Sequence, residues 1–75
     1  MKIKSKFDER QLELIAELHI DIEQDFNKER LEDFEDKVYN KMMDNLESEQ
    51  NFTDKATEYE NILDIVVDIE NNYND

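Results

Sequence analysis

The chain has 75 residues without Cys, Gly or Pro, and its 22 acidic against 9 basic side chains give a net charge of −13. A core of this size supplies only ~3–5 kcal/mol, and with disulfides and thiolate metal sites excluded, association is the expected source of further stability. The lack of Gly excludes P-loops and dinucleotide fingerprints, and the charge disfavours direct contact with nucleic acid or anionic membranes.

Charge and hydropathy are unevenly distributed along the chain. Residues 1–7 carry three Lys and no acid, whereas residues 8–36 carry twelve acids and residues 56–75 carry six acids and no base. The longest apolar runs, residues 14–16 and 65–67, are far shorter than the roughly 20 residues of a membrane span. We therefore expect one soluble, cytoplasmic domain over residues 1–75, without a signal peptide.

The first predicted helix begins near Ser5 or Asp8, where a capping side chain precedes a helical pattern. This pattern consists of Leu12, Ile15, His19, Ile22 and Phe26. Two shorter alternations are typical of strands: residues 18–22, and the opening MKIKSKF, which allows a short N-terminal strand. Over residues 18–22 we prefer the helix, because its pattern is longer than the alternation.

The second predicted helix begins around residues 25–27. Its apolar stripe follows steps of three and four and consists of Leu31, Phe34, Val38, Met42 and Leu46. It should end within ESEQNFTD, because Ser, Asn and Thr favour helix caps over helix interiors.

The third predicted helix covers about residues 53–71, and the tail 71–75 is expected to fray. Its stripe begins at Phe52 and continues through Tyr59, Ile62, Val66, Ile69 and Tyr73. The surplus of apolar side chains in ILDIVVDI indicates burial on two sides, either at the centre of a bundle or across a dimer interface. The predicted fold is therefore all-α, a bundle of about three helices, expected as a homodimer.

A carboxylate occupies every fourth position through the N-terminal half of the chain. The series is Glu9, Glu13, Glu17, Asp21, Asp25, Glu29 and Asp33, and the same step recurs at Glu60, Asp64 and Asp68. Like charges four residues apart on a helix repel by about 0.2–0.5 kcal/mol per pair, so folding alone does not explain the rows. A step of four advances about 6 Å and winds slowly around the helix, which approximates the phosphates of one DNA strand. We expect these carboxylates to bind a basic partner, although a helix break near residues 25–29 divides the first row.

A calcium site is the competing interpretation of the same region. Oxygen-bearing side chains stand at the ligand positions of a twelve-residue EF-hand loop: Asp21, Glu23, Asp25, Asn27, Glu29 and Glu32. Phe26 occupies the position that needs Gly for a sharp turn, and Lys28 stands where that family has an apolar residue. Because acids are so frequent here, a chance match is the simpler explanation, and we expect no metal and no other cofactor.

Catalysis has few candidate residues. His19 is the only His, it stands between Leu18 and Ile20, and no Cys or His–carboxylate motif accompanies it. A small helical domain also has little room for a dry cleft that would shift the pKa of a carboxyl group. We therefore expect no catalytic residues and no enzyme activity.

A small acidic helical chain with regularly spaced carboxylates resembles, by type, the DNA-mimic inhibitors of bacteriophages. In length, charge and Asn/Lys/Ile-rich usage it is most similar to the staphylococcal-phage inhibitors of the bacterial sliding clamp. The resemblance covers the composition and the rows at residues 9–33 and 60–68. It implies that the carboxylates fill the DNA channel of the clamp and block replication in the host cytoplasm.

The predicted function is thus inhibition of a basic DNA-binding host protein by DNA mimicry. The alternative is an acidic helical adaptor or regulatory protein. In that case the apolar face around Ile62, Val66 and Ile69 would bind the partner, and the acids would keep the chain in solution.

Overall fold

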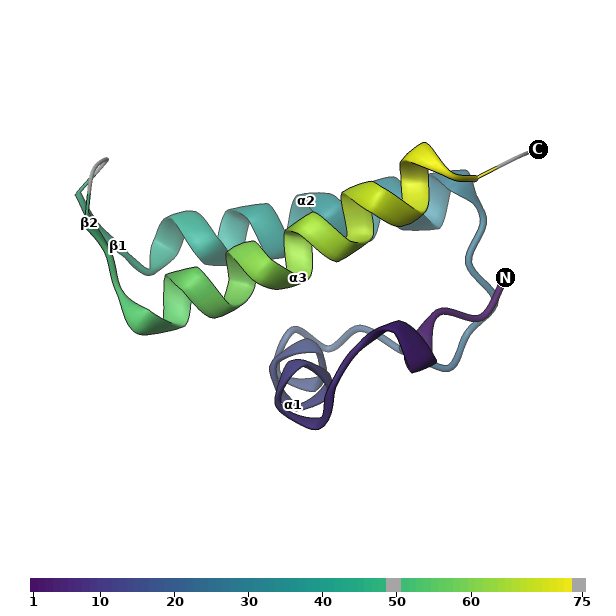
Figure 1. Cartoon of the computed structure of the whole chain (residues 1–75), viewed down its shortest axis with the longest axis horizontal. Coiled ribbons are helices and arrows are strands. Elements are labelled where there is room, and N and C mark those ends of the chain that lie inside the picture. Colours follow the sequence, from purple (N-terminus) through teal and green to yellow (C-terminus); the bar gives the residue numbers. More distant parts are fainter. Residues whose placement is uncertain (49–50, 74–75) are drawn as a thin grey trace.

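A computed structural model describes residues 1–48 and 51–73 of the chain. In this part, three α-helices and one two-stranded antiparallel ribbon make up the fold (Figure 1). In chain order they are α1 (Glu9–Glu17), α2 (Lys28–Asp44), β1 (Leu46–Ser48), β2 (Asn51–Phe52) and α3 (Asp54–Asn71). The predicted all-α class is confirmed.

The helices form two layers. α2 and α3 pack against each other as an antiparallel hairpin, and the β1–β2 ribbon joins them at one end (Figure 1). α1 and the N-terminal segment form the second layer, and α1 is seen nearly end-on where α2 and α3 lie lengthwise. α1 therefore crosses the hairpin on one side, and no described element covers the opposite side.

Aromatic side chains connect the two layers. The ring of Phe34, on α2, lies 6.0 Å from the ring of Phe7 and 5.6 Å from the ring of Phe26, measured between centroids. Leu14 and Ile15 of α1 and Ile3 are buried in the same core. Its largest part is the seam between α2 and α3: Leu31, Val38 and Met42 from α2, with Ala56, Tyr59, Ile62, Val66 and Ile69 from α3. Among the described residues, no polar or charged side chain is buried with them.

The three helices begin where the sequence predicts, each at a capping side chain. Asp8 accepts a hydrogen bond from the Gln11 N–H at 2.8 Å, and the Gln11 side chain accepts one from the Asp8 N–H at 2.9 Å. Asn27 caps α2 at 2.8 Å, and Thr53 caps α3 at 3.1 Å. Each contact satisfies a backbone donor that the first turn of a helix leaves free.

α1 is shorter than predicted and ends at Glu17. His19 follows with φ of 60°, the left-handed conformation that ends many helices and usually falls on Gly. This chain has no Gly, and His adopts that conformation more readily than most side chains. Ile22 and Phe26 therefore leave the predicted helix and lie on the connector 18–27, where neither that helix nor the alternative strand forms.

The possible N-terminal strand does not form either. Lys4–Lys6 make one turn of 3-10 helix, and Ile3 and Phe7 on either side of it are buried. Met1 and Phe26 exchange two backbone hydrogen bonds, with N···O distances of 2.7 and 3.0 Å. The N-terminal segment is thus anchored to the connector at one point, and its apolar side chains enter the core.

α2 ends at Asp44, earlier than its predicted stripe requires. Leu46, predicted as the last member of the stripe, lies on β1. β1 pairs with β2 in the register Leu46 with Phe52 and Ser48 with Asn51. Nothing in ESEQNFTD predicts this ribbon, because the sequence contains neither Asn-Gly nor Pro to mark a turn.

α3 has its predicted bounds, and its stripe lies at the centre of the core. Tyr59, Ile62 and Val66 are fully buried, Ile69 is nearly so, and Tyr73 is half-buried. Of the two predicted settings, the structure shows the centre of a bundle for these four side chains. Of the tail expected to fray, residues 71–73 close the helix, and residues 74–75 lie outside the described residues.

Phe34→Ala is expected to remove most of the stability of the domain. Truncation of a core Phe costs about 3–5 kcal/mol, which is comparable with the ~3–5 kcal/mol that a core of this size supplies. Circular dichroism during urea titration should therefore show a largely unfolded chain even without urea. Tyr39→Ala removes an exposed ring from the same helix and should keep the wild-type transition. A folded Phe34→Ala chain would contradict the role given to this ring.

Candidate acidic binding surface

The structure distributes the ten predicted partner-binding carboxylates over four segments. α1 carries Glu9, Glu13 and Glu17, the connector Asp21 and Asp25, α2 Glu29 and Asp33, and α3 Glu60, Asp64 and Asp68. The first seven do not form one row, because the connector 18–27 leaves the helical path after Glu17. The break is wider than the predicted one near residues 25–29.

The chain's own cations neutralise four of these carboxylates. The N···O distances are 3.3 Å for Glu13 with Arg10, 3.5 Å for Glu17 with Lys55, 3.6 Å for Asp25 with the Met1 ammonium, and 3.2 Å for Asp33 with Lys37. Exposed pairs of this kind add only about 0–1 kcal/mol each to stability. Their larger effect is on the electrostatic field, since each places a cation beside a carboxylate predicted to face a partner.

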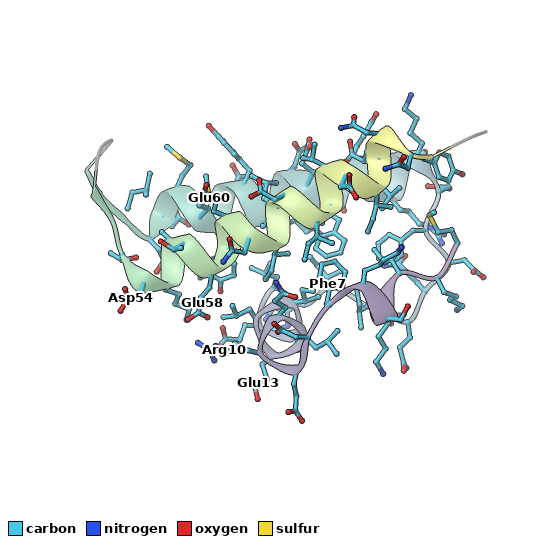
Figure 2. The ribbon with its side chains drawn as sticks, in the orientation of Figure 1. Phe7, Arg10, Glu13, Asp54, Glu58 and Glu60 are labelled. Atoms are coloured by element: carbon cyan, nitrogen blue, oxygen red, sulfur yellow. The ribbon has the colours of Figure 1, made fainter. Side chains whose placement is uncertain are left out.

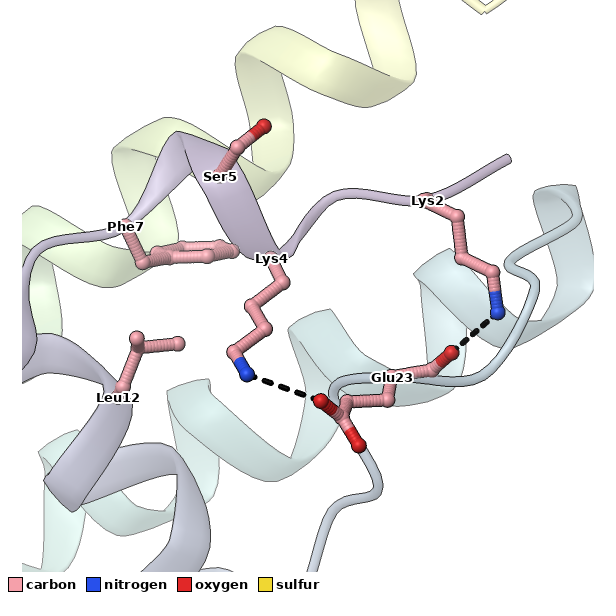
Figure 3. Close-up of a pocket in the computed structure, with 6 residues that line it drawn as sticks. All are labelled: Lys2, Lys4, Ser5, Phe7, Leu12 and Glu23. Atoms are coloured by element: carbon pink, nitrogen blue, oxygen red, sulfur yellow. Dashed lines mark hydrogen bonds and ion pairs between the residues drawn. The ribbon is translucent and has the colours of Figure 1, made fainter.

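Two of the three N-terminal lysines, Lys2 and Lys4, are bound to the connector. The Lys4 Nζ lies 2.9 Å from the Glu23 Oε1, and the Lys2 Nζ donates to the Glu23 carbonyl oxygen (Figure 3). The hydrogen bond from Lys4 is the main cause that lowers the pKa of Glu23 below its ordinary value. Phe7 and Leu12 complete a shallow pocket beside these groups. Because both lysines already have acceptors, this pocket is a weak candidate for binding an anion.

Two ion pairs join α1 to α3. The Arg10 Nε lies 2.8 Å from the Glu58 Oε2 (Figure 2), and the Lys55 Nζ lies 3.5 Å from the Glu17 Oε2. The hydrogen bond with Glu58 raises the pKa of the Arg10 guanidinium. The Tyr59 hydroxyl donates to Glu17 at 3.5 Å, and burial, reinforced by the Glu17 charge, raises the pKa of Tyr59. The side of α3 that faces α1 is therefore largely neutralised.

The row on α3 is the part of the predicted pattern that stays intact. Glu60, Asp64 and Asp68 lie four residues apart on one uninterrupted helix, and no described cation lies within 4.0 Å of their carboxylates. Asp64 and Asp68 are exposed, and Glu60 is half-buried. Figure 2 shows Glu60 on the side of the hairpin opposite Arg10 and α1. Among the described residues, no ion pair offsets the charge of this row.

The structure also brings together four carboxylates that the spacing does not single out. Burial raises the pKa of Glu70, on α3, and the charges of Glu35, Glu32 and Asp36, on α2, raise it further, while Lys28 lowers it. One Glu70 oxygen is buried without a hydrogen-bond partner among the described residues. The cluster depends on the register between α2 and α3, which no local pattern contains. The four-residue step from Glu32 to Asp36 is its one trace in the sequence.

A shallow acidic pocket lies along the first turns of α2. Its lining consists of Asn27, Glu29, Arg30, Glu32, Asp33 and Asp36. Four of these six side chains are carboxylates, so the pocket favours a basic group over an anion. Together with the row on α3, it gives the α2–α3 hairpin a predominantly negative surface.

The structure also places the EF-hand-like segment and His19, neither of which the sequence predicts to be a site. Phe26 is buried in the core, and the left-handed residue of the connector is His19, so the sharp turn of an EF-hand loop does not fall at position 26. The described residues contain no group of three or more acidic or His side chains placed to hold a metal ion. His19 is exposed at the end of α1 instead of lying on its apolar side. None of the described helices combines the length and apolar character needed to cross a membrane.

The chain matches no protein-family model, no curated protein and no solved structure. The charge, exposure and placement of its own residues are therefore what bears on its function. Among these features, the negative surface of the α2–α3 hairpin is the most prominent.

Glu70→Gln is expected to stabilise the protein at pH 7. Since the folded-state pKa of Glu70 is raised above its ordinary value of 4.5, the charged carboxylate is a penalty that the folded state carries at neutral pH. The penalty disappears as the pH falls through the raised pKa, because the folded chain then holds the proton. Thermal melts should show a higher melting temperature for the variant than for wild type at pH 7.

The same comparison at pH 4 should show a much smaller gain, because wild-type Glu70 is then largely protonated. Glu60→Gln, on the same helix and outside the cluster, is the control and should change the melting temperature less. A Glu70→Gln variant that is less stable than wild type at pH 7 would show that this carboxylate has a stabilising partner.

Proposed function

We propose that the protein is a stoichiometric DNA-mimic inhibitor, whose carboxylates occupy the DNA-binding site of a basic host protein. The observation that carries the proposal is the row Glu60, Asp64 and Asp68, which is continuous and has no cation beside it in the described part. The replicative sliding clamp is the first target to test, because the resemblance in length, charge and Asn/Lys/Ile-rich composition points to inhibitors of that ring. Occupation of its DNA channel would block replication.

A second set of carboxylates on α2 supports a two-row arrangement. Glu32 and Asp36 repeat the step of four, and so do Glu29 and Asp33, although Lys37 pairs with Asp33. α2 and α3 are antiparallel neighbours. The hairpin therefore presents negative rows on two adjacent helices, as a duplex presents two phosphate backbones.

The size of the domain is also compatible with this role. Its Cα atoms extend over 37 × 22 × 17 Å, and the two shorter dimensions are comparable with the width of a DNA duplex. The domain is thus of the same order of width as the duplex that a DNA-binding channel or cleft accepts. The core closes within a single copy, so the proposal does not require the predicted homodimer, which stays a prediction.

The energetics favour a basic site. Binding relieves the repulsion between neighbouring carboxylates of the α3 row, about 0.2–0.5 kcal/mol per pair. A net charge of −13 speeds the encounter with a positive surface, and both effects weaken as salt screens the charges. Inhibition should therefore depend strongly on salt concentration, as DNA binding by the same target does.

The apolar face that the adaptor alternative needs for partner binding is buried. Ile62, Val66 and Ile69 lie in the core between the helices, and their relative exposure does not exceed 5 %. A partner would have to open the domain to reach them. DNA mimicry needs only side chains that are already on the surface, and we therefore favour it.

Neutralising the α3 row should reduce binding to the target. The triple variant Glu60→Gln, Asp64→Asn and Asp68→Asn removes three charges and keeps the side-chain shapes. If each carboxylate contributes roughly 0.5 kcal/mol, the dissociation constant for purified sliding clamp should rise about 10-fold. Fluorescence anisotropy at low and moderate salt, with duplex DNA as competitor, measures this change.

A second triple, Glu13→Gln, Glu17→Gln and Asp25→Asn, is the matched control. It removes the same charge from carboxylates that have cations of their own, and it should bind nearly as tightly as wild type. Thermal melts should show the α3 variant as stable as wild type or more so, since like charges have been removed. Equal losses in both triples would mean that net charge, and not the row, determines binding. No binding of wild type at any salt concentration would exclude the clamp as the target.

A further inference from the structure

The side of α2 that faces away from α1 carries exposed apolar side chains. Tyr39 is 49 % exposed and Met43 is 43 % exposed, and they lie one helical turn apart. Among the described residues, Met1 is the other large apolar side chain exposed to this degree. Two exposed apolar residues side by side on the hairpin form a local patch, and in a small acidic protein such a patch needs an explanation.

α3 continues this patch on the same side of the hairpin. Glu60 points away from α1 (Figure 2), and helical periodicity places Leu63, Val67 and Glu70 on its side of the helix. Leu63 and Val67 are only half-buried. The apolar surface of α3 thus has a carboxylate at each end.

The charge interactions of Glu70 show how α2 and α3 are aligned on this side. Glu35 and Glu32 act on Glu70 across the helix pair, so their side of α2 adjoins the Glu70 side of α3. Tyr39 and Met43 follow Glu35 at steps of four on that same side of α2. We call this combined surface the outer face: Glu32, Glu35, Tyr39 and Met43 of α2, with Glu60, Leu63, Val67 and Glu70 of α3.

We propose that the outer face binds a basic amphipathic helix of a partner protein. The apolar stripe of that helix packs over Tyr39, Met43, Leu63 and Val67, and its Lys and Arg side chains contact the surrounding carboxylates. Helices recognised in this way place apolar anchors three and four residues apart in a groove between helices.

Charge complementarity selects this occupant. Carboxylates of both helices border the apolar patch, and Lys28 is the one cation that acts on Glu70. Glu70, one oxygen of which is buried without a hydrogen-bond partner, would have its charge offset by a Lys or Arg of the partner at the edge of the face. An acidic or neutral helix would leave this charge uncompensated.

A second copy of the chain is a poor occupant of the same face. A two-fold contact places the same surface of both copies together, so the carboxylates of one outer face would meet those of the other. Such like-charge contacts are unfavourable, and they become more so as water is excluded from between them. An anionic membrane surface is disfavoured for the same reason.

This inference goes beyond DNA mimicry and does not depend on it. Asp64 and Asp68 are exposed on α3 outside the outer face, and binding of a helix needs no DNA-binding partner. A peptide test of the outer face can therefore fail while inhibition of a DNA-binding protein holds, and the reverse is equally possible.

The test uses two synthetic peptides and the full chain. One peptide of about 18 residues, or ~27 Å of helix, carries a Leu stripe at helical spacing with Lys and Arg elsewhere. The other has the same composition in an order without a stripe. We expect fluorescence anisotropy at physiological ionic strength to show binding of the amphipathic peptide at least ~10-fold tighter than that of its scrambled counterpart, a difference of about 1.4 kcal/mol.

Two pairs of substitutions locate the site. Tyr39→Gln with Met43→Gln keeps good helix formers on α2 and should weaken binding of the amphipathic peptide about 10-fold, with no effect on the scrambled peptide. Glu32→Gln with Glu35→Gln should also weaken binding. Its matched control, Glu9→Gln with Asp21→Asn, removes the same charge from positions outside the face that have no ion pair among the described residues, and should not. Circular dichroism establishes that each variant is folded.

Three results would overturn the proposal. Equal affinity for the two peptides would show that only charge attracts them. Unchanged affinity in the folded Tyr39→Gln, Met43→Gln variant would place the peptide elsewhere. A dimer in sedimentation velocity experiments that this same variant converts to a monomer would show that a second copy covers the face.

Discussion

The contact of the Phe34 ring with Phe7 and Phe26 joins the two layers of the molecule, and the placement of each surface follows from it. The chain has no disulfide to hold its N-terminal segment or connector in place. Apolar side chains must therefore do so, and Ile3, Phe7 and Phe26 enter the core from segments outside the long helices. Because these segments and α1 lie on one side of the hairpin, its other side is left open. The packing of these segments therefore determines which charged side chains of the hairpin stay exposed.

The cations of the chain are concentrated on the covered side. Arg10 and Lys55 join α1 to α3, and Lys2 and Lys4 join the N-terminal segment to the connector. Each pair is exposed and contributes little to stability. Their arrangement matters more for recognition, since acids near these cations are neutralised and acids on the far side of α3 are not. An uneven surface of this kind orients a basic partner as well as attracting it.

Patterns that act within a few residues could be predicted from the sequence. Asp8, Asn27 and Thr53 start the helices because a cap needs only its own first turn, and the buried stripes of α2 and α3 follow from their periodicity. The end of α1 at His19 could not be predicted, because the left-handed conformation at a helix end is usually adopted by Gly, and this chain has none. The carboxylate cluster around Glu70 could not be predicted either, since it depends on the alignment of α2 with α3. The seven N-terminal carboxylates do not form one row, because α1 ends at Glu17. The three carboxylates on α3 do form a row, because that helix is uninterrupted.

The repeated carboxylates also become easier to explain in the folded chain. Repulsion at steps of four costs only a few tenths of a kcal/mol per pair, and the α2–α3 seam buries enough apolar side chains to tolerate it. Selection for stability alone would still favour a Lys in each turn, and α3 has no base after Lys55. The two proposed surfaces use the resulting charge differently. The α3 row suits a channel lined with basic side chains, whereas the outer face suits a single basic helix. A DNA-binding protein that inserts a basic helix into the major groove would present to the outer face the same side chains that it presents to phosphates. The architecture of the target, more than its net charge, would then decide which surface of this protein it meets.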